Sequence, residues 1–166
     1  ALNISSLVFM VPLGLASAAA VRVGHAMGAR DPARAVHAGW TALGLCVVVM
    51  LLFAAGLFTL ARSLLGAFSQ DEHVIATGAR LLVIAAAFQL VDGIQTVATG
   101  TLRGLGDTRT PMFVNIVGHW ALGLPVGYAL CFWRGWGVSG LWIGLTTGLT
   151  ACGVSLLVTW IVRTRA

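Results

Sequence analysis

Asp92 is the residue of this chain whose type and position most directly predict chemistry. It lies in a long apolar stretch, 12 residues after Arg80 and 11 residues before Arg103. In a helix these intervals span roughly 18 Å and roughly 16 Å, so the two arginines fit opposite faces of a hydrocarbon layer about 30 Å thick. An acid near the midplane costs about 3 kcal/mol to insert. Because folding rarely requires such a charge, Asp92 indicates an ion or substrate pathway.

Polar side chains accompany Asp92 on one face of the same predicted helix. At 100° per residue they fall within an arc of about 120°, and the opposite face is apolar. These residues are Gln89, Asp92, Gln95, Thr96 and Thr99. A polar stripe on a membrane-spanning helix should face protein or water, so we expect a cleft that prefers cations. A proton could serve as the coupling ion. In the alternative interpretation Asp92 only forms a hydrogen bond between helices.

Three further candidates for the lining of this cleft lie in the following apolar segment: Asn115, His119 and Trp120. His119 could relay protons, although a single histidine in a helix also serves as an ordinary packing residue. Trp120 and Tyr128 could stack on a flat aromatic cation. Pro125 lacks an N–H group and is therefore expected to loosen this helix.

The composition predicts an integral membrane protein built of helices. Of the 166 residues, 58% are apolar and 9% are charged, whereas soluble domains average about 25% charged residues. Five apolar segments are each long enough to cross a bilayer. They cover residues 2–21, 32–61, 72–102, 111–133 and 136–162. We therefore expect an all-α fold of five transmembrane helices in a single membrane domain.

Local sequence patterns predict the ends of these helices and the contacts between them. Helix starts are marked by Asp31-Pro32, Thr110-Pro111 and a capping box that runs from Ser69 to Glu72. Helix ends are marked by Gly28 and by Gly104 or Gly106. Small residues recur at intervals of four as Gly140, Gly144, Gly148 and Cys152, and again as Gly123 and Gly127. We interpret these stripes as close helix contacts.

Arginine supplies all ten basic residues, and its distribution predicts the orientation. Seven arginines fall on the side of the first turn, the third turn and the tail, and three fall on the other side. The positive-inside rule then makes the C-terminus cytoplasmic. Because the arginines flank apolar segments, the net charge of +5 does not indicate nucleic-acid binding. The start lacks Met and a basic n-region, so we interpret residue 1 as an internal position of a longer protein.

The sequence lacks the motifs that indicate several classes of chemistry. Cys46, Cys131 and Cys152 lie far apart without a histidine at metal-binding spacing, so neither a disulfide nor a thiolate metal site is expected. There is no P-loop, so ATP is not the energy source within this chain. There is also no catalytic pair, which disfavours an intramembrane enzyme. We expect no cofactor beyond a coupling ion.

Four motifs and the opening of the chain carry a specific resemblance. The motifs are Gln89-Leu-Val-Asp-Gly-Ile-Gln95, Gly100-Thr-Leu-Arg-Gly-Leu-Gly-Asp-Thr-Arg-Thr-Pro111, Gly123-Leu-Pro-Val-Gly-Tyr128 and Gly137-Val-Ser-Gly-Leu-Trp-Ile-Gly-Leu145. With residues 1–14 and 21–28, they closely resemble the multidrug and toxic compound extrusion (MATE) family, in its NorM-like branch. The resemblance covers the whole chain and implies helices eight to twelve of a twelve-helix transporter. These five helices would form most of the C-terminal six-helix lobe.

The resemblance also implies a function. It implies export of hydrophobic or cationic small molecules from the cell by alternating access, coupled to Na⁺ or H⁺, in a membrane such as the bacterial inner membrane. Asp92 matches the family's cation-site aspartate on helix ten. The chain lacks the N-terminal lobe and the seventh helix with its glutamate, so the fragment is not expected to work alone. Phe88, a further candidate for the lining of the cleft, lacks the hydroxyl that some members carry four positions before the aspartate, which leaves Na⁺ and H⁺ open.

Two other functions remain as alternatives. The chain could be a structural membrane segment without a site of its own, in which case Asp92 would tolerate Asn or Leu with only a loss of stability. It could also belong to a lipid-linked saccharide flippase of the same superfamily. Such flippases tend to have several arginines within the cleft, whereas here only Asp92 is central.

Overall fold

The computed structural model describes residues 2–66, 72–133, 135 and 138–165, and the side chains of 10–56, 59, 88–133, 140, 141 and 143–165. The described elements are helical. They are α1 (Leu2–Gly28), α2 (Pro32–Gly66), α3 (Glu72–Gly104), α4 (Arg109–Ile116), η1 (Val117–Gly123), α5 (Leu124–Tyr128), η2 (Ala129–Trp133) and α6 (Val138–Arg165). The segments α4, η1, α5 and η2 follow one another without a break and form one long helix, referred to below as the fourth helix. The expected all-α fold of five long helices is confirmed for this part of the chain.

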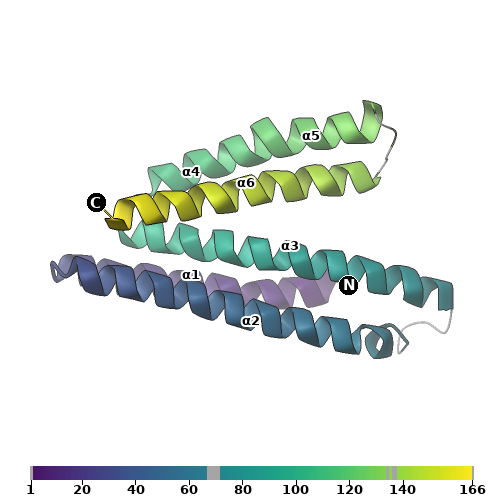
Figure 1. The fold of residues 1–166 in the computed structure, drawn as a ribbon, viewed down its shortest axis with the longest axis horizontal. Helices are drawn as coiled ribbons and strands as arrows, with labels where there is room; N and C mark the ends of the chain where they lie inside the picture. Colours follow the sequence, from purple (N-terminus) through teal and green to yellow (C-terminus); the bar gives the residue numbers. More distant parts are fainter. Residues whose placement is uncertain (1, 67–71, 134, 136–137, 166) are drawn as a thin grey trace.

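The helix α3 lies at the centre of the bundle. It has α1 and α2 on one side and the fourth helix and α6 on the other (Figure 1). The α1–α2 turn, the α3–α4 turn and the C-terminus lie at the same end of the bundle. This end carries the seven exposed arginines whose distribution predicted the orientation, namely Arg22, Arg30, Arg34, Arg103, Arg109, Arg163 and Arg165. The three remaining arginines lie outside the described side chains.

The surface of the bundle is apolar, as expected of a protein surrounded by lipid. Leu52 is 67% exposed and Trp133 is 84% exposed. Four stretches of the described residues are long and apolar enough to cross a membrane: Met10–Gly28, Pro32–Gly56, Arg109–Trp133 and Ile143–Arg165. The helices extend beyond the expected spans, and α1 continues past residue 21 to Gly28. A helix can extend beyond the hydrocarbon layer because its backbone hydrogen bonds are satisfied internally in water as well as in lipid.

Two helix ends share one local design. In each, the residue after the last turn has a positive φ, 56° at Arg30 and 85° at Gly106. The backbone N–H groups of Asp31 and Asp107 then donate to carbonyl groups five residues earlier, which is the Schellman arrangement. Gly28 and Gly104 are the last helical residues, as predicted. The first left-handed position, however, is filled by an arginine, which the sequence patterns did not indicate.

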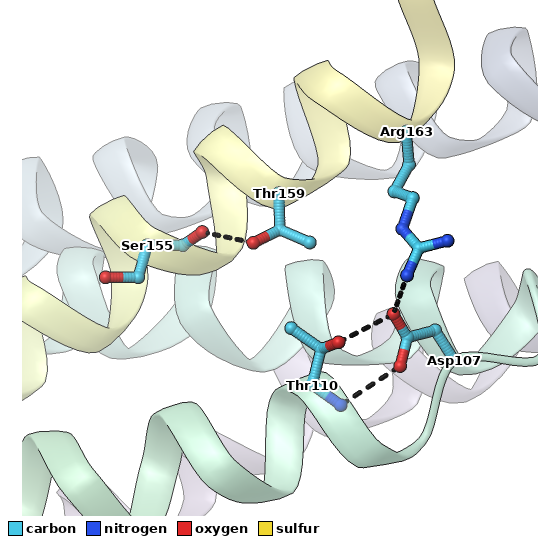
Figure 2. Close-up of polar contacts among 5 residues, drawn as sticks. All are labelled: Asp107, Thr110, Ser155, Thr159 and Arg163. Atoms are coloured by element: carbon cyan, nitrogen blue, oxygen red, sulfur yellow. Dashed lines mark hydrogen bonds and ion pairs between the residues drawn. The ribbon is translucent and has the colours of Figure 1, made fainter. Parts of the chain in front are cut away.

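An aspartate follows each of these turns and stabilises the next helix start. Oδ1 of Asp31 accepts a hydrogen bond from the backbone N–H of Arg34, as its predicted capping role requires. The predicted cap at Thr110 is wrong, because α4 begins at Arg109 and Asp107 makes the capping contacts instead. Asp107 accepts from both the N–H and the hydroxyl of Thr110, at 3.0 and 2.7 Å (Figure 2). The predicted capping box before Glu72 includes Ser69 to Asp71, which lie outside the described residues.

Glycines bring the fourth helix and α6 into direct backbone contact, which confirms that the small-residue stripes serve packing. A Cβ added at Gly144 would lie 2.3 Å from Cα of Gly127, and one at Gly148 would lie 2.6 Å from the carbonyl oxygen of Gly118. The wider π-helical turns of η1 and η2 flank the segment that holds Pro125. The expected loosening of this helix is therefore present, because proline interrupts the regular hydrogen-bond ladder.

Candidate functional site

Asp92 lies half-buried in α3, 12 residues before the last residue, Gly104. At 1.5 Å per residue this places it about 18 Å from that end of the helix. Arg103 is exposed near the end, as predicted, while Arg80 lies outside the described side chains. His119 of η1 lies within electrostatic range of Asp92. The two titratable candidates are thus on different helices of the same bundle.

Gln95 and Asn115 form a second link between the same two helices. Nε2 of Gln95 donates a hydrogen bond to Oδ1 of Asn115, and Nδ2 of Asn115 donates to the carbonyl oxygen of Pro111 at 2.8 Å. Gln95 lies one turn after Asp92, and Asn115 lies one turn before His119. This hydrogen bond joins two of the predicted cleft residues, Gln95 on α3 and Asn115 on α4.

Gln95 is the most buried of the predicted cleft residues on α3. Its side chain is only 7% exposed. Its Oε1 atom is buried and has no hydrogen-bond partner in the described part of the chain. A buried acceptor that remains unpaired costs about 1–3 kcal/mol. The site therefore presents an oxygen that is suited to receive a hydrogen-bond donor or a cation.

His119 is held by two contacts to its Nδ1 atom. Nδ1 lies 3.1 Å from the backbone oxygen of Asn115 and 3.6 Å from Sγ of Cys152. Because a carbonyl oxygen only accepts, Nδ1 carries the hydrogen in the contact with Asn115. Cys152 was predicted only as a small packing residue, and its thiol also donates to the carbonyl of Val114 at 3.3 Å. Its place in the stripe of small residues was the only signal of this contact.

Trp120 lies in a different environment from the Gln95–Asn115 link. It is 71% exposed and lines an open groove of about 380 Å³ between the fourth helix and α6. The remaining lining residues are His119, Gly123, Leu124, Gly127, Leu141 and Leu145. The groove is therefore almost entirely apolar, and it touches the polar link only through His119.

The other predicted side chains are half-buried or exposed, and none of them is as buried as Gln95. Phe88, Gln89, Thr96 and Thr99 are all half-buried on α3. Tyr128 packs against Phe132 with ring centroids 4.7 Å apart, so one neighbour of its ring is already an aromatic side chain. The predicted stacking of Tyr128 on a substrate stays a prediction.

A polar contact that the sequence patterns missed joins the α3–α4 turn to α6. Arg163 Nη2 lies 3.2 Å from Oδ2 of Asp107 (Figure 2). The backbone N–H and the hydroxyl of Thr110 are the main groups that lower the pKa of Asp107 below its ordinary value, and the charge of Arg163 contributes further. The spacing of Asp107 and Thr110 matches that of Asp31 and Arg34, which is the signal that could have identified the cap. No sequence signal indicated its partner on α6, Arg163, which lies 56 positions away.

Comparison with known proteins agrees with this architecture. Residues 1–129 match the family model described as MatE. The chain is 46% identical over 165 residues to a multidrug resistance protein NorM of Burkholderia vietnamiensis, covering 96% of this chain and 35% of that protein. It is 47% identical over 163 residues to a probable multidrug resistance protein NorM of Deinococcus radiodurans, covering 95% and 36%. The chain thus spans about a third of the length of these curated relatives.

Solved structures show the same helix arrangement. The crystal structure of the eukaryotic MATE transporter AtDTX14 matches 99% of this chain and 38% of that one, with a TM-score of 0.83 and 27% identity. An inward-facing multidrug resistance MATE family transporter of the MOP superfamily matches with a TM-score of 0.81, over 98% of this chain and 38% of that one. At 18% identity it supports the fold alone. With the family model matching 129 of 166 residues, the chain belongs to the MatE family.

Proposed function

We propose that this chain forms part of the C-terminal lobe of a multidrug exporter, in which a cation acting at Asp92 drives the release of hydrophobic or cationic compounds. The observation that carries the proposal is the half-buried carboxylate of Asp92 midway along α3. Acids inside membrane-spanning segments are costly and commonly serve ion pathways. The NorM relatives, named for multidrug resistance, support the substrate class.

In this mechanism, Na⁺ or H⁺ from outside neutralises Asp92 during alternating access. Neutralisation lowers the affinity of the exporter for a cationic compound and so favours its outward release. The coupling cannot exceed the difference in the affinity of the ion for the two conformations. For a typical coupling free energy of about 1–3 kcal/mol, the ion changes the affinity for the compound by about 5- to 150-fold.

The arginine distribution supports an orientation for this mechanism. Seven exposed arginines surround the end of the bundle that holds the α1–α2 turn, the α3–α4 turn and the C-terminus. By the positive-inside rule this end faces the cytoplasm, and the exporter is a multi-pass protein of a bacterial inner membrane. Asp92 is then reached from the outside through a cleft formed with the rest of the exporter.

The proposal is tested by replacing Asp92 with Asn in the full-length exporter and measuring the efflux of a cationic dye from vesicles. Efflux is driven by an imposed Na⁺ gradient in one set of vesicles and by a pH gradient in another. The variant should lose the gradient-dependent component, because an amide at this position cannot change its charge when the ion binds.

Asp107→Asn is the matched control, since it makes the same chemical change at the end of the bundle, outside the spans. After correction for the amount of folded protein, it should retain gradient-dependent efflux. If Asp92→Asn exports the dye with undiminished coupling, the proposed role of Asp92 is wrong.

A further inference from the structure

One face of α2 carries charged, then aromatic, then aliphatic side chains in order from the α1–α2 turn inward. The exposed residues of this face are Arg34, His37, Trp40, Leu45, Val48 and Leu52. At 100° per residue they fall within an arc of about 140°. The opposite face of α2 packs against α1 and α3 and buries Leu43, Cys46 and Met50. The exposed face is therefore a continuous strip at the edge of the bundle (Figure 1).

The order of side chains along this strip matches the order of chemical groups in a phospholipid. Trp40 lies six residues after Arg34, which is about 9 Å along the helix axis, and Leu45 lies about 16 Å from Arg34. The headgroup region of each leaflet is about 5–8 Å thick. An arginine at the level of the phosphates thus places Trp40 near the hydrocarbon boundary, which aromatic rings prefer, and Leu45 among the acyl chains.

The arginines at the top of the strip are not neutralised by the protein around them. Arg30 and Arg34 are both exposed, and the one nearby carboxylate in the sequence belongs to Asp31. Oδ1 of Asp31 accepts from the backbone N–H of Arg34, so it serves as a helix cap. Among the described side chains, the ion pair at this end of the bundle joins Arg163 to Asp107 instead. The guanidinium groups of Arg30 and Arg34 are therefore available to an anion from outside the chain, and their planar shape suits a phosphate.

We propose that this strip of α2 binds an anionic phospholipid. The phosphate lies at Arg30 and Arg34, and the acyl chains run along Leu45, Val48 and Leu52. A zwitterionic lipid covers the apolar part equally well but leaves the positive charge uncompensated, whereas a free phosphate ion leaves the apolar part uncovered. The inference requires only that α2 crosses a bilayer, so it does not depend on the role of Asp92.

The test is the quenching of Trp40 fluorescence by lipids with brominated acyl chains. Trp40 is 45% exposed on this strip, and bromine quenches an indole that it contacts. The full-length protein is placed in phosphatidylcholine vesicles, and the signal of Trp40→Phe is subtracted to isolate Trp40. Brominated phosphatidylglycerol should quench at lower mole fractions than brominated phosphatidylcholine with the same chains. The expected preference is about 5-fold for each arginine that meets the phosphate.

Substitutions at Arg34 show whether this preference comes from charge. Arg34→Gln should reduce the preference by about 5-fold, and Arg34→Lys should retain most of it. Arg109→Gln is the matched control, because Arg109 is exposed at the same end of the bundle but begins α4, which packs against α3 and α6. This control should leave the quenching of Trp40 unchanged.

Three results would overturn the proposal. Equal quenching by the two lipids would show that the strip does not select the headgroup. Absence of quenching by either lipid would show that another segment of the full-length protein covers the strip. If inorganic phosphate abolishes the preference at constant ionic strength, the arginines bind a soluble anion and not a lipid.

Arg30→Gly separates the loss of charge from any loss of folding. Glycine adopts the positive φ of 56° at this position without steric cost, so the variant should fold at least as well as the wild type. It should nevertheless lose part of the preference for phosphatidylglycerol. A folded Arg30→Gly variant with the full preference contradicts the placement of the phosphate at Arg30 and Arg34.

Discussion

Replacing Gly144 with Ala should disrupt the contact between the fourth helix and α6. The added Cβ would lie 2.3 Å from both Cα and N of Gly127, and 2.7 Å from the carbonyl oxygen of Gly123. Carbon atoms in contact prefer about 3.5–4.0 Å, so the two backbones must separate locally by about 1 Å. None of the three close atoms belongs to a side chain that could rotate away. Such overpacking costs about 1–3 kcal/mol.

Gly44→Ala provides the comparison within the same protein. Gly44 lies in α2, and no atom lies within 4 Å of the position that its Cβ would take. Alanine should therefore be accommodated there, and it favours a helix by about 0.5–1 kcal/mol relative to glycine.

Thermal denaturation of the purified full-length protein in detergent measures the difference. The midpoint should fall for Gly144→Ala and stay the same or rise for Gly44→Ala. A Gly144→Ala variant that is as stable as the wild type would refute the inferred backbone contact. It would mean that the two helices can move apart without losing favourable packing.

Two further predictions concern the turns at the arginine-rich end of the bundle. Arg30→Gly should raise the thermal midpoint, by up to about 1 kcal/mol in stability, because glycine adopts the positive φ of 56° without steric cost; a lower midpoint would contradict this. Asp107→Ala should lower stability at pH 7 by about 0.5–2 kcal/mol, as expected for the loss of a helix cap. Because the folded-state pKa of Asp107 is lowered, its stabilising contribution is complete above the unfolded value of about 3.9. It is lost as the pH falls through the lower folded value. The difference between the wild type and Asp107→Ala, measured as thermal midpoints across this pH range, should therefore shrink below about pH 4.

Much of this structure follows from local sequence patterns. Apolar runs predicted the long helices because the hydrocarbon layer requires satisfied backbone hydrogen bonds and apolar side chains over a fixed length. Asp31-Pro32 predicted a helix start because its capping contact involves residues within one turn. The stripe that contains Gly144 and Gly148 predicted a close helix contact because small side chains at intervals of four form one flat face. The prediction for Thr110 was wrong because Asp107, three residues earlier, has the longer reach of a carboxylate to the same helix start.

The sequence by itself thus determined which residues share a helix face, including Asp92 and Gln95 on α3. Only the tertiary structure decided which face of the neighbouring helix they meet. The hydrogen bond from Gln95 to Asn115 joins residues 20 positions apart, and the ion pair of Asp107 and Arg163 joins residues 56 positions apart. Helix periodicity fixes the angle of a side chain about its own axis. The rotation and register between two helices depend instead on how glycines and large side chains fit together across the whole interface.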